Sequence, residues 1–300
     1  MESTIKILLA APTYSGKIYC QDQWLDQLEK LTYPVDVLIV DNSKYPNNYE
    51  YLKEKAENSK HNFKVEYCKP KPGTSVRDAL NDCMTIIRKA ILDGGYTHWF
   101  SLETDVFIPY NTIEYLLAFD KSFIGLPYFH GSGVNGTFLM QQDFPGLDKR
   151  LSNISLPKKS FLDFKGELIT CYQGGIGCCL VKRAVIEYIP FRIADFAPEQ
   201  FPDAFFHDDC LKAKIPYYIC TGVIAEHINN GDRWKAVQKE RPAYESKEVE
   251  IALMDLGLCD ECQYLYIEQI GESKKYCCLV TDDLEIKDNS IRECKNFESR

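Results

Sequence analysis

The sequence has no apolar run long enough to cross a bilayer, and it has no surplus of basic residues. Its 35 lysines and arginines are outnumbered by 44 aspartates and glutamates, which gives a formal net charge of −9. This acidic balance argues against general binding to nucleic acid. The first residues also lack the basic and apolar layout of a secretory signal, so we expect a cytoplasmic protein without a transmembrane segment.

Short apolar runs alternate with stretches of helical spacing through the first hundred residues. Lys6–Ala11 and Val35–Val40 are continuous apolar runs typical of strands buried on both faces, and His98–Leu102 is a further strand. The longest amphipathic stretch between them is Ser75–Leu92. This order predicts an α/β sandwich with a mainly parallel central sheet, in which ligands bind beyond the carboxyl ends of the strands.

Two carboxylates stand directly after the strand His98–Leu102. Because side chains alternate along a strand, Glu103 and Asp105 are expected to point to the same side. Neighbouring carboxylates repel each other, and a hard divalent cation relieves that repulsion while binding oxygen ligands and substrate phosphates. The pair therefore predicts a metal site, although a polar strand end without a ligand gives the same pattern. The loops Pro12–Gly16 and Asp41–Ser43 are expected at the same edge.

Seven segments, in their order along the chain, resemble the GT-A fold of nucleotide-sugar glycosyltransferases, most closely the family-2 type. They are Ala10–Tyr14, Asp41–Ser43, Gly73–Asn81, Glu103–Asp105, Gly174–Arg183, Pro202–Phe206 and Val223–Ile228. The resemblance implies a Rossmann-like three-layer sandwich over residues 1–235. It also implies the transfer of a sugar from a UDP- or GDP-sugar to an acceptor hydroxyl, with inversion at the anomeric carbon. The donor sugar stays open, and so does the acceptor, whether glycan, lipid or protein.

The resemblance implies that the first two loops and one arginine hold the donor nucleotide. Pro12, Thr13, Tyr14 and Asp41 would contact the nucleoside, and an ionised aspartate can accept from the imide N–H of uracil or from a ribose hydroxyl. Asp41 also suits a simple helix-capping role. Arg77 would brace the diphosphate, or it is a solvated charge at the start of a helix.

The resemblance also implies a metal centre for Mn²⁺ or Mg²⁺. Asp105 would be the principal ligand within the motif Glu103-Thr104-Asp105, with Thr104 near the nucleotide. Glu103 stands where an aspartate is commoner, so its longer side chain can ligate the cation, contact the ribose or support another ligand. His227, after the predicted strand Tyr217–Ala225, would complete the coordination and favour manganese, or it is a hydrogen-bonded surface histidine.

An inverting transfer needs a carboxylate that accepts the proton of the acceptor hydroxyl. Asp203 matches the late acidic position implied by the resemblance. Asp208 and Asp209 are the other candidates, as a pair that opens a helix predicted over 209–214, where capping is their simpler role. Gly174 and Gly175 would let the backbone approach the sugar or acceptor, or they form an ordinary turn.

The cysteines fall into two groups. Of the 13, those before residue 230 lie in apolar surroundings and are expected to be buried and free. The others have a spacing typical of a four-cysteine metal site in a small module over residues 236–300, and they are Cys259, Cys262, Cys277, Cys278 and Cys294. We expect Zn²⁺ there, with an iron–sulfur cluster or unligated, disulfide-linked cysteines as alternatives. A hairpin of Tyr264–Gln269 with Tyr276–Thr281 would carry part of the module.

Two other functions fit parts of the pattern. A sugar-phosphate nucleotidyltransferase uses similar carboxylates at strand ends but usually opens with a glycine-rich basic loop, and the segment Ala10–Lys17 has one glycine and one lysine. A protein that binds a nucleotide or a partner without catalysis would explain the glutamate at position 103.

Overall fold

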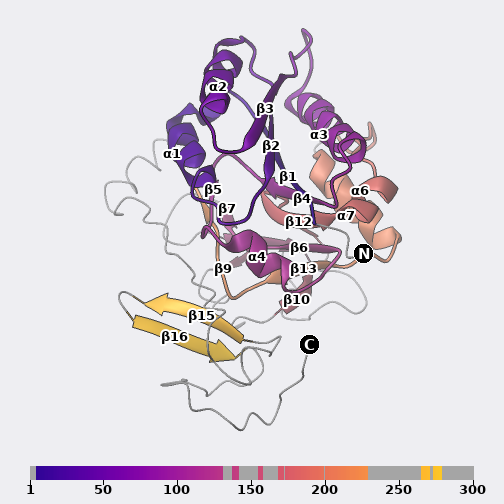
Figure 1. The fold of residues 1–300 in the computed structure, drawn as a ribbon. Coiled ribbons are helices and arrows are strands. Elements are labelled where there is room, and N and C mark those ends of the chain that lie inside the picture. Colours follow the sequence, from indigo (N-terminus) through magenta and orange to yellow (C-terminus); the bar gives the residue numbers. More distant parts are fainter. Residues whose placement is uncertain are drawn as a thin grey trace.

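A computed structural model describes residues 5–130, 137–141, 155–157, 168–171, 173–198, 200–228, 265–270 and 273–278. Its centre is an eight-stranded sheet with the strand order β10-β13-β6-β12-β4-β1-β2-β3 (Figure 1). In chain order these strands are β1 Ile7–Thr13, β2 Asp36–Asp41, β3 Asn62–Tyr67, β4 His98–Leu102, β6 Phe123–Gly125, β10 Leu168–Cys171, β12 Cys178–Lys182 and β13 Tyr217–Cys220.

The sheet is mixed but mostly parallel. Strands β3, β2, β1 and β4 are parallel neighbours, and β6 and β13 form another parallel pair. Strand β12 runs antiparallel between β4 and β6, and β10 is antiparallel to β13 at the edge. This arrangement confirms the predicted α/β fold with its mainly parallel central sheet.

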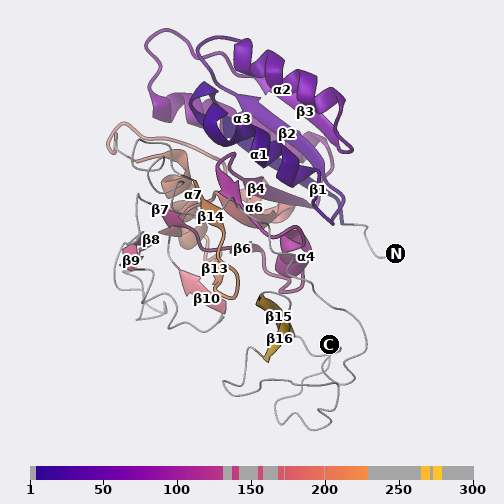
Figure 2. The same ribbon diagram turned by 90° about the vertical axis from the view of Figure 1, so that its left-hand side faces the viewer.

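Helices cover both faces of the sheet, so the molecule has three layers (Figures 1 and 2). The helical segments are η1 Ser15–Lys17, α1 Ile18–Leu28, α2 Asn47–Glu57, α3 Val76–Asp93, α4 Thr112–Leu117, α6 Arg183–Tyr188 and α7 Pro202–Lys212. Alternate residues of β1 enter different cores: Leu8 packs with α3, α6 and α7, whereas Leu9 packs with α1, α2 and α4. Continuous apolar runs in the sequence follow directly from this burial on both faces.

The long helix α3 begins and ends at the signals that the sequence carries. The hydroxyl of Ser75 accepts a hydrogen bond from the backbone N–H of Asp78, which caps the first turn at 3.1 Å. Gly94 and Gly95 follow the last residue, and Gly95 has a φ of +65° that favours glycine. The prediction over Ser75–Leu92 is confirmed to within one residue at each end.

Two strands of the central sheet end at other residues than predicted. Strand β1 continues to Thr13, because Pro12 and Thr13 still pair with β2, so the loop begins at Tyr14 rather than at Pro12. The predicted strand Tyr217–Ala225 ends at Cys220, and a separate short strand β14, Glu226–His227, follows. This short strand pairs with β5, Val106–Phe107, and not with the central sheet.

The helix predicted over 209–214 in fact begins at Pro202. Proline is favoured in the first turn of a helix because it has no N–H to leave unpaired, and Asp203 beside it complements the helix dipole. Asp208 and Asp209 therefore lie in the second half of α7, and neither opens the helix.

The remaining strands form two small sheets. One joins β7 Phe129–His130, β8 Thr137–Gln141, β9 Ser155–Pro157 and β11 Gln173–Gly174. The other is a hairpin of β15 Leu265–Ile270 with β16 Ser273–Cys278, which confirms a hairpin near the predicted place with its second strand shifted toward the N-terminus. No described helix has both the length and the apolar character needed to span a membrane. The proposed division at residue 235 lies outside the described residues and stays a prediction.

Candidate metal and nucleotide site

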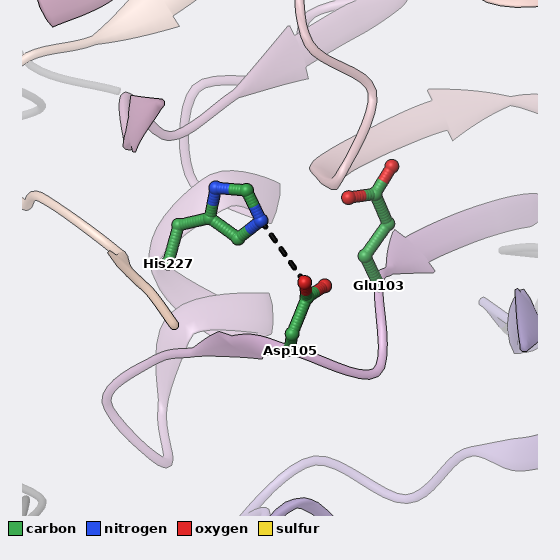
Figure 3. Close-up of side chains that lie close together, drawn as sticks. All are labelled: Glu103, Asp105 and His227. Atoms are coloured by element: carbon green, nitrogen blue, oxygen red, sulfur yellow. Dashed lines mark hydrogen bonds and ion pairs between the residues drawn. The ribbon is translucent and has the colours of Figure 1, made fainter. Parts of the chain in front are cut away.

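Three side chains of the kinds that can bind a metal ion converge beyond the carboxyl end of β4 (Figure 3). Glu103 and Asp105 lie in the turn between β4 and β5, and His227 comes from β14. One ligand atom from each residue lies within 4.8 Å of the others. The residues predicted as metal ligands therefore lie together. The two carboxylates are brought together by a turn, whereas the sequence analysis expected them on one side of a strand.

The backbone explains how His227 reaches a residue 122 positions earlier in the chain. His227 stands opposite Val106 in the β5–β14 pair, and the N–H of Ile228 donates to the carbonyl of Asp105 at 2.8 Å. His227 Nε2 then lies 3.1 Å from Oδ2 of Asp105. Thr104, between the two carboxylates, is buried, and its hydroxyl lies 2.9 Å from that of Thr13, which joins this turn to the end of β1.

Asp105 is the most closely surrounded of the three residues. Its side chain is 1% exposed, and Oδ2 also contacts the ammonium of Lys17 and lies 3.3 Å from the Tyr19 hydroxyl. Its other oxygen, Oδ1, is buried and has no hydrogen-bond partner among the described residues. A buried carboxylate oxygen without a partner is costly, and a cation would satisfy it.

Burial and neighbouring charges shift the pKa values of the two carboxyl groups in opposite directions. Burial raises the pKa of Glu103, and the neighbouring charge of Asp105 raises it further. Burial acts in the same direction on Asp105, but the hydrogen bonds and charges of His227 and Lys17 outweigh it and hold the pKa of that carboxyl below its usual range. Burial lowers the pKa of His227, yet its contact with Asp105 reverses the sign and raises it overall. Within the cluster, Asp105 thus ionises more readily than usual and Glu103 less readily.

These residues fit a divalent cation. Two carboxylates and an imidazole offer the oxygen and nitrogen donors that Mn²⁺ accepts more readily than Mg²⁺ does. The unpartnered Oδ1 of Asp105 supplies the structural reason. Lys17 and Tyr19, which the sequence analysis did not select, occupy the other oxygen.

The loops after β1 and β2 lie side by side next to this cluster. The N–H of Asn42 donates to Thr13 O at 2.9 Å, and the N–H of Ser15 donates to Ser43 Oγ at 2.7 Å. The ring of Tyr14 is about half exposed, and it covers Gly16, where an added Cβ would meet the ring at 2.2 Å. Of the nucleoside contacts predicted from the sequence, Tyr14 is thus the side chain that faces solvent at this edge.

Asp41 has no exposed surface. Its Oδ1 accepts hydrogen bonds from the N–H of Ser43 at 3.2 Å, the hydroxyl of Ser43 at 2.6 Å and the amide of Asn48 at 3.1 Å. These contacts join the loop after β2 to helix α2. The observed role is structural, and the predicted contact with a base or ribose stays a prediction.

Arg77 is directed to another part of the chain. Its guanidinium donates to the carbonyls of Ala194 and Ala197 at 3.2 and 3.1 Å, in the loop between α6 and α7. It is neither a solvated charge nor joined to the carboxylate cluster in this structure. A role in bracing a diphosphate stays a prediction.

Asp203 and Asp209, the two main candidates for the base, differ sharply in their surroundings. Asp203 lies in the first turn of α7, where burial raises its pKa, and its negative charge raises the pKa of Glu103. Asp209 forms a bidentate ion pair with Arg192 at 2.5 and 2.8 Å, which lowers the pKa of Asp209. The charge of Asp208 also acts on Arg192. The charge of Asp203 thus acts on the cluster, whereas Asp209 is paired with Arg192.

The glycines before β12 give space to two buried tyrosines. A Cβ added at Gly175 would lie 1.6 Å from the Tyr128 hydroxyl, and one at Gly174 would lie 2.7 Å from the Tyr217 ring. Gly177, which the sequence analysis passed over, is the closest to the cluster, because its added Cβ would be 2.9 Å from Oε2 of Glu103. The Tyr128 hydroxyl accepts from the N–H of Gly177 at 3.0 Å.

The cysteines before residue 230 behave as predicted. All eight are free, seven of them are buried, and Cys68 is half-buried. In the tail, Cys277 and Cys278 belong to β16, whereas Cys259, Cys262 and Cys294 lie outside the described residues. The four-cysteine metal site therefore stays a prediction.

Comparison with known proteins gives a match in fold and none in sequence. No protein-family model matches the chain, and no curated protein resembles its sequence. The crystal structure of GalNAc-T7 with UDP, GalNAc and Mn²⁺ shares 12% identity over 78% of this chain, with a TM-score of 0.54. S. aureus TarS with UDP-GlcNAc shares 16% identity over 80%, with a TM-score of 0.47. The matches cover 46% of the GalNAc-T7 chain and 62% of the TarS chain. The fold is that of the GT-A glycosyltransferases.

Proposed function

We propose that the chain is a glycosyltransferase that moves a sugar from a nucleoside-diphosphate sugar to an acceptor hydroxyl with the help of a divalent cation. One observation carries the proposal: Glu103, Asp105 and His227 converge at the carboxyl edge of a GT-A sheet, beside the loops after β1 and β2. GalNAc-T7, whose structure holds UDP, GalNAc and Mn²⁺, has a similar fold, which supports a nucleotide and a metal as ligands.

In this proposal the cluster binds the cation and the exposed Tyr14 faces the base. Asp105 and His227 are the principal ligands, and Glu103 adds a carboxylate whose raised pKa lets a cation promote its ionisation. When bound, the cation offsets the negative charge that develops on the leaving diphosphate. Gly177 leaves room for the Glu103 carboxylate, so a larger residue there would displace a ligand.

We assign the proton acceptor to Asp203. Its carboxylate takes the proton of the acceptor hydroxyl while the acceptor oxygen bonds to the anomeric carbon and the bond from that carbon to the diphosphate breaks. Burial raises the pKa of Asp203, which strengthens it as a base while it is ionised. This single displacement inverts the anomeric centre. The ion pair of Asp209 with Arg192 favours a structural role for Asp209.

Calorimetry with UDP, and separately with GDP, tests the metal-dependent site. One nucleotide should bind with Mn²⁺ present and lose most of its affinity in chelator or in Asp105→Ala. Asp120→Asn is the control, because Asp120 is an exposed carboxylate paired with Lys182 and has a φ of +46° that asparagine tolerates. Equal binding with chelator, or in Asp105→Ala, would contradict the proposal.

Release of the nucleoside diphosphate from a panel of UDP- and GDP-sugars, with water as the acceptor, tests catalysis. Asp203→Asn should abolish the release and leave nucleotide binding within a few-fold, because it removes a group used only in the transition state. Wild-type activity in that variant would refute the assignment of the base. Formation of a nucleotide sugar from UTP and a sugar 1-phosphate would indicate a nucleotidyltransferase instead.

A further inference from the structure

Lys17 places a positive charge against a proposed ligand of the metal ion, Asp105. It ends η1, in the loop between β1 and α1, and its ammonium contacts Oδ2 of Asp105. The lysine side chain is 25% exposed and that of Asp105 is 1% exposed, so the pair is largely shielded from water. Lysine is rarely buried unless it is paired, and here the pair is made with the central carboxylate of the proposed cation site.

The contact uses one oxygen of the carboxylate that the cation site also needs. His227 Nε2 lies 3.1 Å from the same Oδ2, whereas Oδ1 has no partner among the described residues. A cation that binds the unpartnered Oδ1 of Asp105 would share this carboxylate with the lysine ammonium on Oδ2. Two cations next to one carboxylate repel each other, so occupation by one weakens binding of the other.

Lys17 lies in the loop after β1, next to the place proposed for the nucleotide, so its ammonium has a second possible partner there. Ser15, two residues earlier, is held by its hydrogen bond to Ser43, so the start of the loop is joined to the loop after β2. The lysine head sits on a flexible four-carbon stem and carries three donors but no acceptor. A diphosphate bound at this edge would offer it an alternative anionic partner.

We propose that Lys17 is an internal counter-ion that competes with the divalent cation for Asp105. The free protein then binds the cation weakly, and the cation binds firmly once a diphosphate has drawn the lysine ammonium away. This inference rests on the proposed function. It adds that the protein binds a cation more tightly when a nucleotide is bound as well than when the cation is alone.

Titration with Mn²⁺, followed by the electron paramagnetic resonance signal of the free ion, tests the competition. Lys17→Met should bind Mn²⁺ without nucleotide about tenfold or more tightly than the wild type, since a hydrogen bond to a charged group contributes a factor of that order. UDP should increase the affinity for Mn²⁺ by a larger factor in the wild type than in Lys17→Met. Lys17→Arg, which keeps the ion pair, should resemble the wild type.

Lys44→Met is the matched control, because it removes the same charge from the loop after β2. Lys44 is exposed, and its ammonium lies over the ring of Tyr45 at 5.3 Å, away from Asp105. Its Mn²⁺ affinity should stay within about twofold of the wild type, since exposed charges are strongly screened. An equal gain in Lys44→Met would show a general effect of charge and would overturn the competition.

Thermal unfolding gives a second measurement that needs no nucleotide. Without metal, Lys17→Met leaves two acidic side chains facing each other, so its melting temperature should be lower than that of the wild type. Saturating Mn²⁺ should raise the melting temperature of Lys17→Met more than that of the wild type. Equal or weaker Mn²⁺ binding in Lys17→Met overturns the inference alone. Failure of both proteins to bind Mn²⁺, with or without UDP, overturns the metal site and the proposed function with it.

Discussion

His207 should make the stability of this protein fall as the pH decreases. It lies on α7, is 1% exposed, and its ring stacks on Phe123 with the centroids 5.3 Å apart. Tyr217 lies against the same imidazole at 4.8 Å. Burial among these rings lowers the pKa of His207 from 6.5 to about 4.

The sign and size of the effect follow from proton linkage. Between these two pKa values the unfolded chain binds the proton and the folded chain does not, so protonation favours unfolding. The contribution of neutral His207 is fully present above pH 6.5 and is lost as the pH falls toward 4. With about 1.4 kcal/mol per pKa unit, the loss is about 2 kcal/mol at pH 5 and about 3 kcal/mol at pH 4.

Urea denaturation followed by tryptophan fluorescence at pH 7, 6 and 5 measures this effect. His207→Phe keeps an aromatic ring at the site and removes the titration, so the gap in unfolding free energy between it and the wild type should shift by about 2 kcal/mol from pH 7 to pH 5. Phe206→Leu, which perturbs the same core and leaves the histidine in place, should run parallel to the wild type. If the curve of His207→Phe also runs parallel, the reasoning is refuted.

Three further predictions concern the glycines, the second acidic candidate and the tail. Gly175→Ala should lower stability by about 1–3 kcal/mol in urea denaturation, because the added methyl overlaps the buried Tyr128 hydroxyl; an unchanged midpoint would contradict the close packing. Asp209→Asn should cost no more than about 1 kcal/mol, because Arg192 is 35% exposed, and should retain donor hydrolysis; its loss would make Asp209 the base in place of Asp203. Purified protein should hold about one tightly bound zinc per chain, released in a Cys259→Ser, Cys262→Ser double variant, and metal analysis without zinc or iron would exclude the four-cysteine site.

The fold followed from the sequence because the central strands of its sheet are buried on both faces. A run such as Val35–Val40 has no exposed side to interrupt it, and Ser75 with Gly94 marks the ends of α3. The predicted helix start at Asp209 failed because two aspartates inside α7 resemble a cap, whereas Pro202 was the true signal. The sequence alone could not show which role the aspartates have, because helix capping and ion pairing use the same side chains.

The convergence of Glu103, Asp105 and His227 was predictable from the sequence, but the residues around them were not. Asp105 and His227 stand at the ends of apolar segments, where the order of the fold points to them. Lys17 and Tyr128 gave no such signal. The contact of Lys17 with Asp105 depends on the path of a loop, and the ring of Tyr128 lies 5.4 Å from that of His227 across the fold. Asp41 was predicted to contact the nucleoside, and in the structure it joins Ser43 to Asn48. A carboxylate at a strand end suits both roles, so the sequence does not separate them.

The short β5–β14 pair that carries His227 is not part of the central sheet, so the site can open without unfolding of the sheet. Segment Ala225–Ile228 is held by the β5–β14 pair, by the bond from Ile228 to Asp105 and by the 2.8 Å bond from Ala225 N–H to Pro127 O. Releasing so few backbone bonds costs much less than separating β1 from its two neighbours in the sheet. A sub-global opening confined to this segment would withdraw the imidazole and would remove only Ala225 and Ile228 from the core that packs against α1, α2 and α4. A folded state of this kind would lack one ligand of the proposed metal site, and amide exchange at Ile228 would report the fraction of molecules in which the imidazole is in place.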